Sequence, residues 1–131
     1  MEDKTDTIQR WLARAEHDLL TAQTMLALPN APTDVVCFHC QQCMEKALKA
    51  WLAYAQRDFP KTHDLQRLLS LCSKDDDEFR HLGENAVALA DYAVETRYVD
   101  DWREIPKQEA VDAVAWASMA LEFVRRKVGL S

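Results

Sequence analysis

The chain has few residues that interrupt regular structure, with only 2 glycines and 4 prolines among 131 residues. Runs of alternating β-branched residues are also absent, whereas alanine, leucine, glutamate and lysine are plentiful. This composition favours helices throughout. The length is enough for one domain with a single core and too short for two ordinary ones, so we treat residues 1–131 as one domain.

Long apolar runs are missing as well. No stretch of 18 apolar residues exists, and a helix that spans a membrane needs about that many. The first residues, Met1 to Lys4, are polar and do not resemble the start of a secretory signal. We therefore expect a cytoplasmic protein without a membrane span, whose 4 cysteines are reduced thiols.

Positive charge is in the minority, because the formal net charge is −6. A general nucleic-acid binder presents a broad basic face to phosphates, and this chain is unlike such a protein. A small basic pocket on an acidic surface is still compatible with the composition.

Apolar residues recur at the i, i+3, i+4 spacing of an amphipathic helix along most of the chain. This pattern predicts an all-α fold, a single-domain antiparallel bundle of about five helices. The predicted helices cover residues 6–28, 33–57, 63–72, 76–95 and 106–128. The second is the longest, and we expect it to be the central element.

Residues at the expected helix ends support these boundaries. Thr62 is a plausible N-cap for the third helix, and Asp75 with Glu78 fits a variant of the capping box before the fourth. Pro106 suits the first turn of the last helix, and Gly129 suits its end.

Three cysteines, Cys37, Cys40 and Cys43, have a spacing that resembles half of a zinc site. They lie inside a strongly helical segment, where they spread over about 120° of the helix surface. A second ligand pair is lacking, since Cys72 stands alone. The pattern therefore favours buried thiols, and we expect neither a metal nor a cofactor.

A polar stripe runs along the predicted second helix. Gln42, Lys46 and Lys49 share one face, with Glu45 beside it and four residues before Lys49, the favourable order for an ion pair. One interpretation is a solvated face with a weak surface salt bridge. The other is a lysine pair that binds phosphate at the mouth of a groove, with Glu45 holding one lysine in place.

Two further residues are candidates for the same groove. His63, at the start of the third helix, either bonds to the backbone or to Asp64, or it contacts a ligand and transfers protons near neutral pH. Arg97, followed by Tyr98, either stabilises the end of the fourth helix or offers its guanidinium to a phosphate. The histidines at positions 17, 39 and 81 have no motif around them and are assigned to the surface or to packing.

Two segments together, Gln41–Ala50 (QQCMEKALKA) and Lys61–Leu65 (KTHDL), resemble the HEPN domain family. Trp11, Asp18-Leu19 and Arg97-Tyr98 agree with this resemblance, which extends from about residue 8 to about residue 126. HEPN domains are small all-α modules associated with nucleotidyltransferases and with RNA-targeting toxins. The resemblance implies that Arg97 faces the groove beside the second helix, and that Asp18 pairs with Lys46 or Lys49.

The ribonucleases of the HEPN family carry an arginine and a polar residue, followed a few positions later by a histidine. In this chain the positions where that histidine should fall hold Trp102, Arg103 and Glu104. The motif is therefore incomplete, and we expect no efficient RNA cleavage.

Three functions stay open. The first is a non-catalytic module that binds a nucleotide or RNA, or that partners a separate minimal nucleotidyltransferase, in some cases within a toxin–antitoxin pair. The second is a divergent, metal-independent endoribonuclease that uses His63 and Arg97. The third is a purely structural, dimerising partner. The candidate nucleotide-binding residues are Glu45, Lys46, Lys49, His63, Arg97 and Tyr98. The apolar and aromatic surplus predicts a homodimer, with Tyr98 and Trp102 as candidate contacts.

Overall fold

A computed structural model describes residues 4–93 and 103–129 of the protein. These residues form five α helices and one 3₁₀ helix, and none of them lies in a strand: α1 (Lys4–Leu26), α2 (Thr33–Tyr54), α3 (Leu65–Asp75), η1 (Asp77–Leu82), α4 (Gly83–Ala90) and α5 (Lys107–Val128). The predicted all-α bundle of about five helices is confirmed. No helix within the described ranges has the length and the apolar character needed to cross a membrane.

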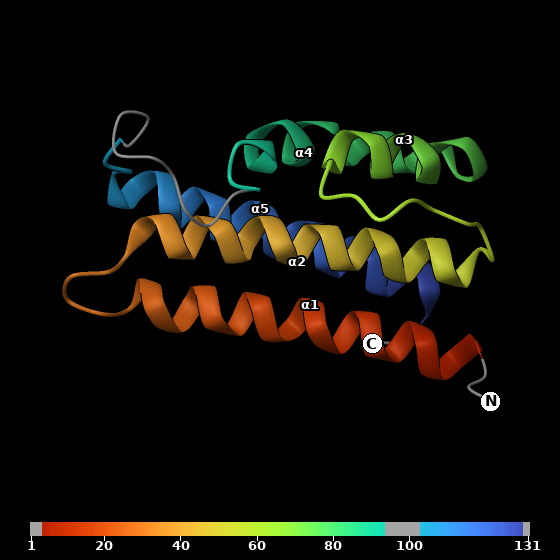
Figure 1. The fold of residues 1–131 in the computed structure, drawn as a ribbon, viewed down its shortest axis with the longest axis horizontal. Coiled ribbons are helices and arrows are strands. Elements are labelled where there is room, and N and C mark those ends of the chain that lie inside the picture. The colour runs from red at the N-terminus through yellow and green to blue at the C-terminus, as the bar shows by residue number, and fades with distance from the viewer. Residues whose placement is uncertain (1–3, 94–102, 130–131) are drawn as a thin grey trace.

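Helix α2 is the central element, as predicted, and it contacts α1, α3, α4 and α5 (Figure 1). It is not the longest helix, because α1 has 23 residues and α2 has 22. Helix α1 runs antiparallel beside it, whereas α5 runs in the same direction as α2. The Oγ1 of Thr33 donates to the carbonyl oxygen of Ile105 at 2.8 Å, which ties the start of α2 to the start of α5. Helices α3 and α4 cover another side of α2.

The core is continuous across the helices, and most of α2 is buried within it. Trp51 of α2 lies with its ring centroid 4.6 Å from that of Phe79, and Phe79 in turn lies 5.1 Å from Phe123 of α5. These aromatic contacts join α2, η1 and α5 in one packed layer. Because most of α2 is buried, the polar side chains along it lie where they require partners.

Helix α2 ends at Tyr54, three residues earlier than predicted. The N–H of Gln56 donates to the carbonyl of Ala53, and the N–H of Arg57 donates to that of Leu52. Gln56 has a left-handed backbone with φ of 57°, so these bonds form a Schellman motif. The motif ends the helix before Pro60 can do so, and the sequence does not reveal it because glutamine replaces the usual glycine.

Helix α3 begins at Leu65, and its cap differs from the prediction. The side chain of Asp64, not that of Thr62, accepts from the N–H of Arg67 at 3.1 Å. Thr62 instead accepts from the N–H of Asp64. Thr62 therefore holds the backbone of Asp64, and Asp64, which directly precedes the helix, is its N-cap.

The single helix predicted for residues 76–95 is wrong. Residues Asp77–Leu82 form the 3₁₀ helix η1, and α4 follows from Gly83 to Ala90. The capping box of Asp75 and Glu78 does not form, because Asp75 binds Arg57 and the side chain of Asp76 accepts from the N–H of Glu78. Helix α5 begins directly after Pro106 and ends at Val128, and the left-handed φ of 72° at Gly129 confirms the predicted stop.

Candidate functional site

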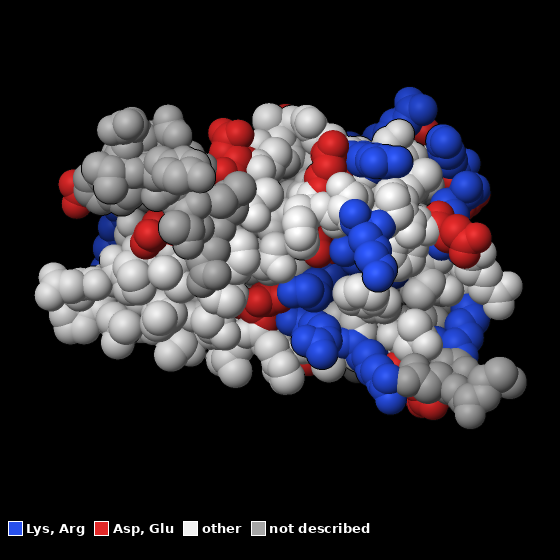
Figure 2. All heavy atoms as spheres, viewed as in Figure 1, with Lys and Arg blue, Asp and Glu red and all other residues white. Residues whose placement is uncertain are grey.

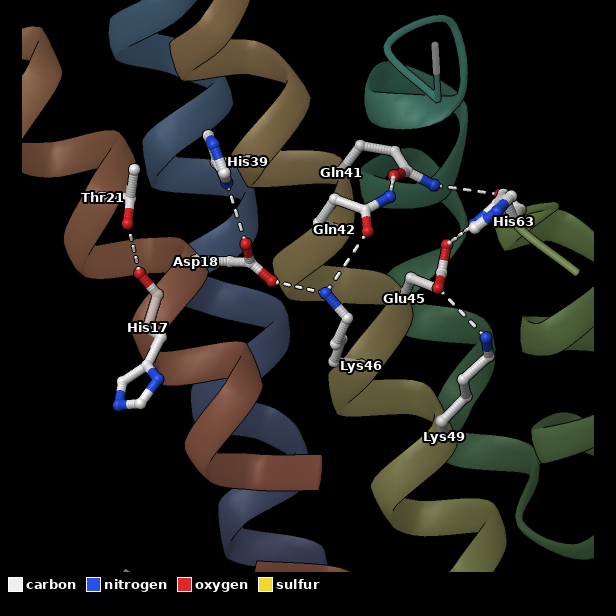
Figure 3. A network of polar contacts seen from close by, with 10 residues as sticks. All are labelled: His17, Asp18, Thr21, His39, Gln41, Gln42, Glu45, Lys46, Lys49 and His63. Carbon is white, nitrogen blue, oxygen red and sulfur yellow. Dashed lines mark hydrogen bonds and ion pairs between the residues drawn. The ribbon is translucent and has the colours of Figure 1, made fainter. Parts of the chain in front are cut away.

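Two carboxylates at the α1–α2 and α2–α3 boundaries each hold one lysine and one histidine (Figure 3). The first is Asp18 of α1. Its Oδ2 lies 2.7 Å from the Nζ of Lys46, and its Oδ1 lies 2.9 Å from the Nδ1 of His39. The predicted pairing of Asp18 with one of the two lysines is therefore confirmed, and the lysine is Lys46. The assignment of His39 to plain surface or packing is wrong, because its ring binds a partly buried carboxylate.

The second carboxylate is Glu45 of α2. Its Oε2 lies 3.0 Å from the Nζ of Lys49, and its Oε1 lies 2.7 Å from the Nδ1 of His63. The side chains of Glu45 and Lys49 are only 3% and 9% exposed, so the pair is not the solvated surface bridge of the first interpretation. The His63 side chain is 68% exposed. A buried carboxylate thus orients a ring that faces solvent.

Two glutamines connect these groups into one network (Figure 3). The Nζ of Lys46 donates to the Oε1 of Gln42 at 3.3 Å, and the amide of Gln42 donates to the Oε1 of Gln41 at 2.6 Å. The amide of Gln41, which is fully buried, donates to the carbonyl oxygen of His63 at 2.9 Å. The segment before α3 is therefore fastened to α2 through both the backbone and the ring of His63.

The network fixes what each group can offer to a ligand. A carboxylate only accepts hydrogen bonds at neutral pH, so the Nδ1 of His63 is the donor toward Glu45 and its Nε2 is left for solvent or a ligand. Lys46 and Lys49 each have a carboxylate partner, so an incoming phosphate would share these ammonium groups with Asp18 and Glu45. The two carboxylates therefore offset part of the positive charge that the lysines present to an anion.

The remaining candidates, Arg97 and Tyr98, lie outside the described residues, as does Trp102. The structure therefore brings together Glu45, Lys46, Lys49 and His63, and the place of Arg97 in the groove stays a prediction. Arg103, at one of the positions where the family's histidine was sought, has another role. Its guanidinium donates two hydrogen bonds to the carboxylate of Glu109.

Glu109 forms a second polar cluster with Tyr92 and Arg103, at the two ends of segment 94–102. The hydroxyl of Tyr92 also donates to Glu109, so a single carboxylate of α5 holds a residue before the segment and a residue after it. The hydrogen bonds from Arg103, and then that from Tyr92, hold the pKa of Glu109 below its ordinary value. Burial, and then the bond to Glu109, raises the pKa of Tyr92.

All four cysteines are buried free thiols, as expected. The Sγ of Cys43 faces the carbonyl oxygen of Ala117, and that of Cys72 faces the carbonyl oxygen of Leu48. Burial raises the pKa of Cys37 to about 11 and that of Cys43 to about 12. Across residues 4–93 and 103–129, no three histidine, cysteine or acidic side chains are grouped so that they could hold a metal ion.

Sequence reasoning overlooked His39 and the role of Gln41. One signal for His39 was present in the chain: residues 39, 42, 46 and 49 follow helical spacing along one face of α2. Nothing in the sequence shows that the amide of Gln41 turns toward the backbone of His63, because that contact joins residues 22 positions apart.

Helices arranged in this way around a polar α2 face define a HEPN-type module, and comparisons with known proteins agree. The HEPN domain family model matches residues 8–127. The crystal structure of TT1696 from Thermus thermophilus is 33% identical to this chain, with a TM-score of 0.77, and the match covers 92% of this chain and 97% of TT1696. The chain belongs to the HEPN domain family.

A second solved structure shares the fold. The crystal structure of ST0689, an archaeal HEPN homologue, has a TM-score of 0.74 at 23% identity, and the match covers 92% of this chain and 97% of that one. No curated protein matches the chain.

Proposed function

We propose that this HEPN domain is a non-catalytic module that binds the phosphate of a nucleotide or of RNA at the α2 face formed by Glu45, Lys46, Lys49 and His63. The observation that supports the proposal is the contact between the exposed ring of His63 and the buried carboxylate of Glu45. A buried ion pair is seldom better for stability than apolar residues of similar size. A function for the ring explains why this cluster is present.

Recognition of the phosphate would use the imidazolium form of His63, in which Nδ1–H donates to Glu45 and Nε2–H donates to the phosphate. The ammonium groups of Lys46 and Lys49 add positive charge beside it while they keep their carboxylate partners. Arg97 and Tyr98, which follow the family pattern, are proposed to complete the site. Two unit charges about 4 Å apart attract each other by about 4 kcal/mol at an effective dielectric near 20, and the carboxylates of Asp18 and Glu45 offset part of this attraction.

The test is isothermal titration of the purified protein with a 5′-mononucleotide and with a short single-stranded RNA. We expect His63→Ala to weaken binding by roughly tenfold or more, since a hydrogen bond to a charged group is worth about 1.5–3 kcal/mol. His81→Ala, which removes an exposed histidine of η1, is the matched control and should bind as the unaltered protein does. Equal affinities of the two variants would contradict the proposal.

The partners are proposed on the family pattern. We propose a homodimer and an association with a separately encoded minimal nucleotidyltransferase, with a toxin–antitoxin pair as one setting. Leu20, Val87 and Met119 are exposed apolar side chains of three different helices, and each is a candidate contact for such a partner. Light scattering that gives a monomer at tens of micromolar would contradict the dimer.

One observation favours a second function, metal-independent RNA cleavage. A ring nitrogen bound to a carboxylate, with the other nitrogen exposed, is also how a general base is oriented. Under this alternative His63 would accept the proton of a 2′-hydroxyl, and Arg97 would stabilise the charge on the phosphate. RNA cleavage that disappears in His63→Ala but persists in His81→Ala would establish it. Intact RNA in all three proteins would support the binding function.

A further inference from the structure

A small cavity of about 290 Å³ lies on the N-terminal half of α1, lined by Thr7, Arg10, Trp11 and Arg14. Residues 7, 11, 14 and 18 follow one stripe of the helix, so the cavity is in line with Asp18, the residue that holds Lys46. Figure 2 shows Lys and Arg side chains gathered on this face over the N-terminal half of α1 and the neighbouring helices. The cavity therefore lies next to the proposed phosphate site.

Trp11 connects the cavity to that site. The Nζ of Lys49 lies 5.5 Å from the centre of the Trp11 ring, and the Phe59 ring packs against Trp11 in a T-shaped contact with 6.2 Å between the ring centroids. Lys49 is in turn bound to Glu45, which holds His63. A short chain of contacts thus joins the indole ring to the residue that carries the proposed phosphate site, and Phe59 fixes the orientation of the indole.

The residues of the cavity have the chemistry of a nucleotide site. The fork of a guanidinium matches two oxygens of a phosphate, and a tryptophan ring is a platform on which any base can stack. Arg10 and Arg14 are exposed and one turn apart. Because Lys46 and Lys49 already hold the two carboxylates, the arginines enlarge the basic character of this face.

We propose that this cavity is a second nucleotide subsite, in which a base stacks on Trp11 and its phosphate binds Arg10 and Arg14. The ligand of the protein is then a single-stranded oligonucleotide that reaches from His63 across α1, and a mononucleotide fills only part of the site. This inference rests on the proposed phosphate-binding function and adds the length and the path of the ligand.

The experiment measures the affinity for a mononucleotide, a dinucleotide and a longer single-stranded RNA by fluorescence anisotropy at several salt concentrations. Affinity should rise with length. In the double variant Arg10→Gln/Arg14→Gln, affinity should depend less steeply on salt. The magnitude of the slope of log affinity against log salt should decrease by roughly 0.7 for each phosphate that is no longer neutralised. Trp11→Leu should weaken binding of the longer RNA by about fivefold to a hundredfold without a change of slope. A purely structural role for the arginines would leave the salt slope unchanged.

The matched control is Arg126→Gln, which removes an exposed arginine of α5. If the double variant and this control bind the longer RNA with the same affinity and the same salt slope, the subsite is wrong. The proposed function survives that result as long as His63→Ala still weakens binding of the mononucleotide. If an acidic peptide of equal charge competes as well as RNA does, the cavity selects for charge alone and the nucleotide assignment is overturned. If no RNA or nucleotide binds, both proposals fail.

Trp11 also packs against the core, so Trp11→Leu could lower stability. Circular dichroism and urea unfolding of each variant separate this effect from binding. The arginine variants replace exposed side chains and decide the question by themselves.

Discussion

The Nδ1 of His63 lies 2.7 Å from the Oε1 of Glu45, yet the two side chains differ in exposure, 68% against 3%. Such a contact joins the interior of the bundle to its surface. Glu45 also holds Lys49, so changes at the ring, the carboxylate and the ammonium group are coupled. This coupling makes the cluster testable through stability as well as through binding.

The first prediction concerns Glu45→Gln. The substitution removes the negative charge but keeps the shape, and it leaves the buried ammonium of Lys49 without its carboxylate. We expect the free energy of unfolding to fall by about 3 kcal/mol, because breaking one side of a buried ion pair is strongly destabilising. Urea unfolding followed by circular dichroism measures the change. A decrease of less than about 0.5 kcal/mol, the size typical of an exposed pair, would show that solvent already screens the two charges.

A double substitution is the internal control for this prediction. Replacing both members, in Glu45→Met/Lys49→Met, removes the charges together and should restore much of the stability. A double-mutant cycle built from Glu45→Met, Lys49→Met and the double variant then isolates the coupling between the two side chains. Additive effects of the two single substitutions would mean that the pair does not interact as the geometry indicates.

The second prediction concerns Gln41, whose amide is fully buried and binds the carbonyl oxygen of His63. Gln41→Leu leaves that carbonyl and the amide of Gln42 without a partner. We expect the free energy of unfolding to fall by about 1–3 kcal/mol. Gln66→Leu on α3, an exposed position, is the matched control and should change stability by less than about 0.5 kcal/mol. Equal effects at the two positions would contradict the role of the hydrogen bond.

The helices were predictable because their apolar residues recur with the period of a buried face. Helix α2 shows this most clearly, and its central place followed from the length of its pattern. The ends of the helices were less predictable, because single side chains determine where a helix stops. Gln56 ends α2 with a left-handed backbone that glutamine rarely adopts, and the side chains of Asp75 and Asp76 bind groups that lie far away in the sequence or outside the expected box.

The site was predictable in part for the same reason. One helix carries Glu45, Lys46 and Lys49, so their spacing in the sequence was enough to predict that they lie close together on its surface. The contacts of Asp18 with His39 and of Gln41 with His63 join different segments, and helical periodicity carries no information on them. Family resemblance supplied the pairing of Asp18 with a lysine, which spacing alone could not have supplied.

The third prediction is a pH dependence of stability that comes from Glu109. Its pKa is held below the ordinary value, mainly by Arg103 and then by Tyr92. A carboxylate with a lowered pKa in the folded state stabilises the fold above its unfolded pKa of about 4.3, and the contribution is lost as the pH falls through the folded value. We expect Glu109→Gln to lower the melting temperature at pH 7. The difference from the unaltered protein should shrink as the pH falls below about 4.

Glu122→Gln, which removes an exposed carboxylate from the same helix, is the control for Glu109. Thermal unfolding of the two variants from about pH 7 to about pH 3 spans the range in which the carboxylate takes up its proton. A melting-temperature difference for Glu109→Gln that stays constant over this range, or that grows toward acid, would contradict the assigned direction of the pKa.

The last prediction concerns the cysteines, whose thiols are all buried in α2 and α3. Two physical effects protect them. The first is that reagents cannot reach the buried sulfur atoms. The second is that burial raises the pKa of Cys37 to about 11 and that of Cys72 to about 12, so little of the reactive thiolate is present. A thiol reagent at about pH 8 should therefore label the cysteines only as fast as the protein unfolds locally or globally, and labelling should accelerate in urea. Ser70→Cys, which adds a thiol at an exposed position of α3, gives the rate for an accessible sulfur. A native cysteine that reacts as fast as this added one would show that its sulfur atom is accessible in the folded protein, and would contradict the prediction.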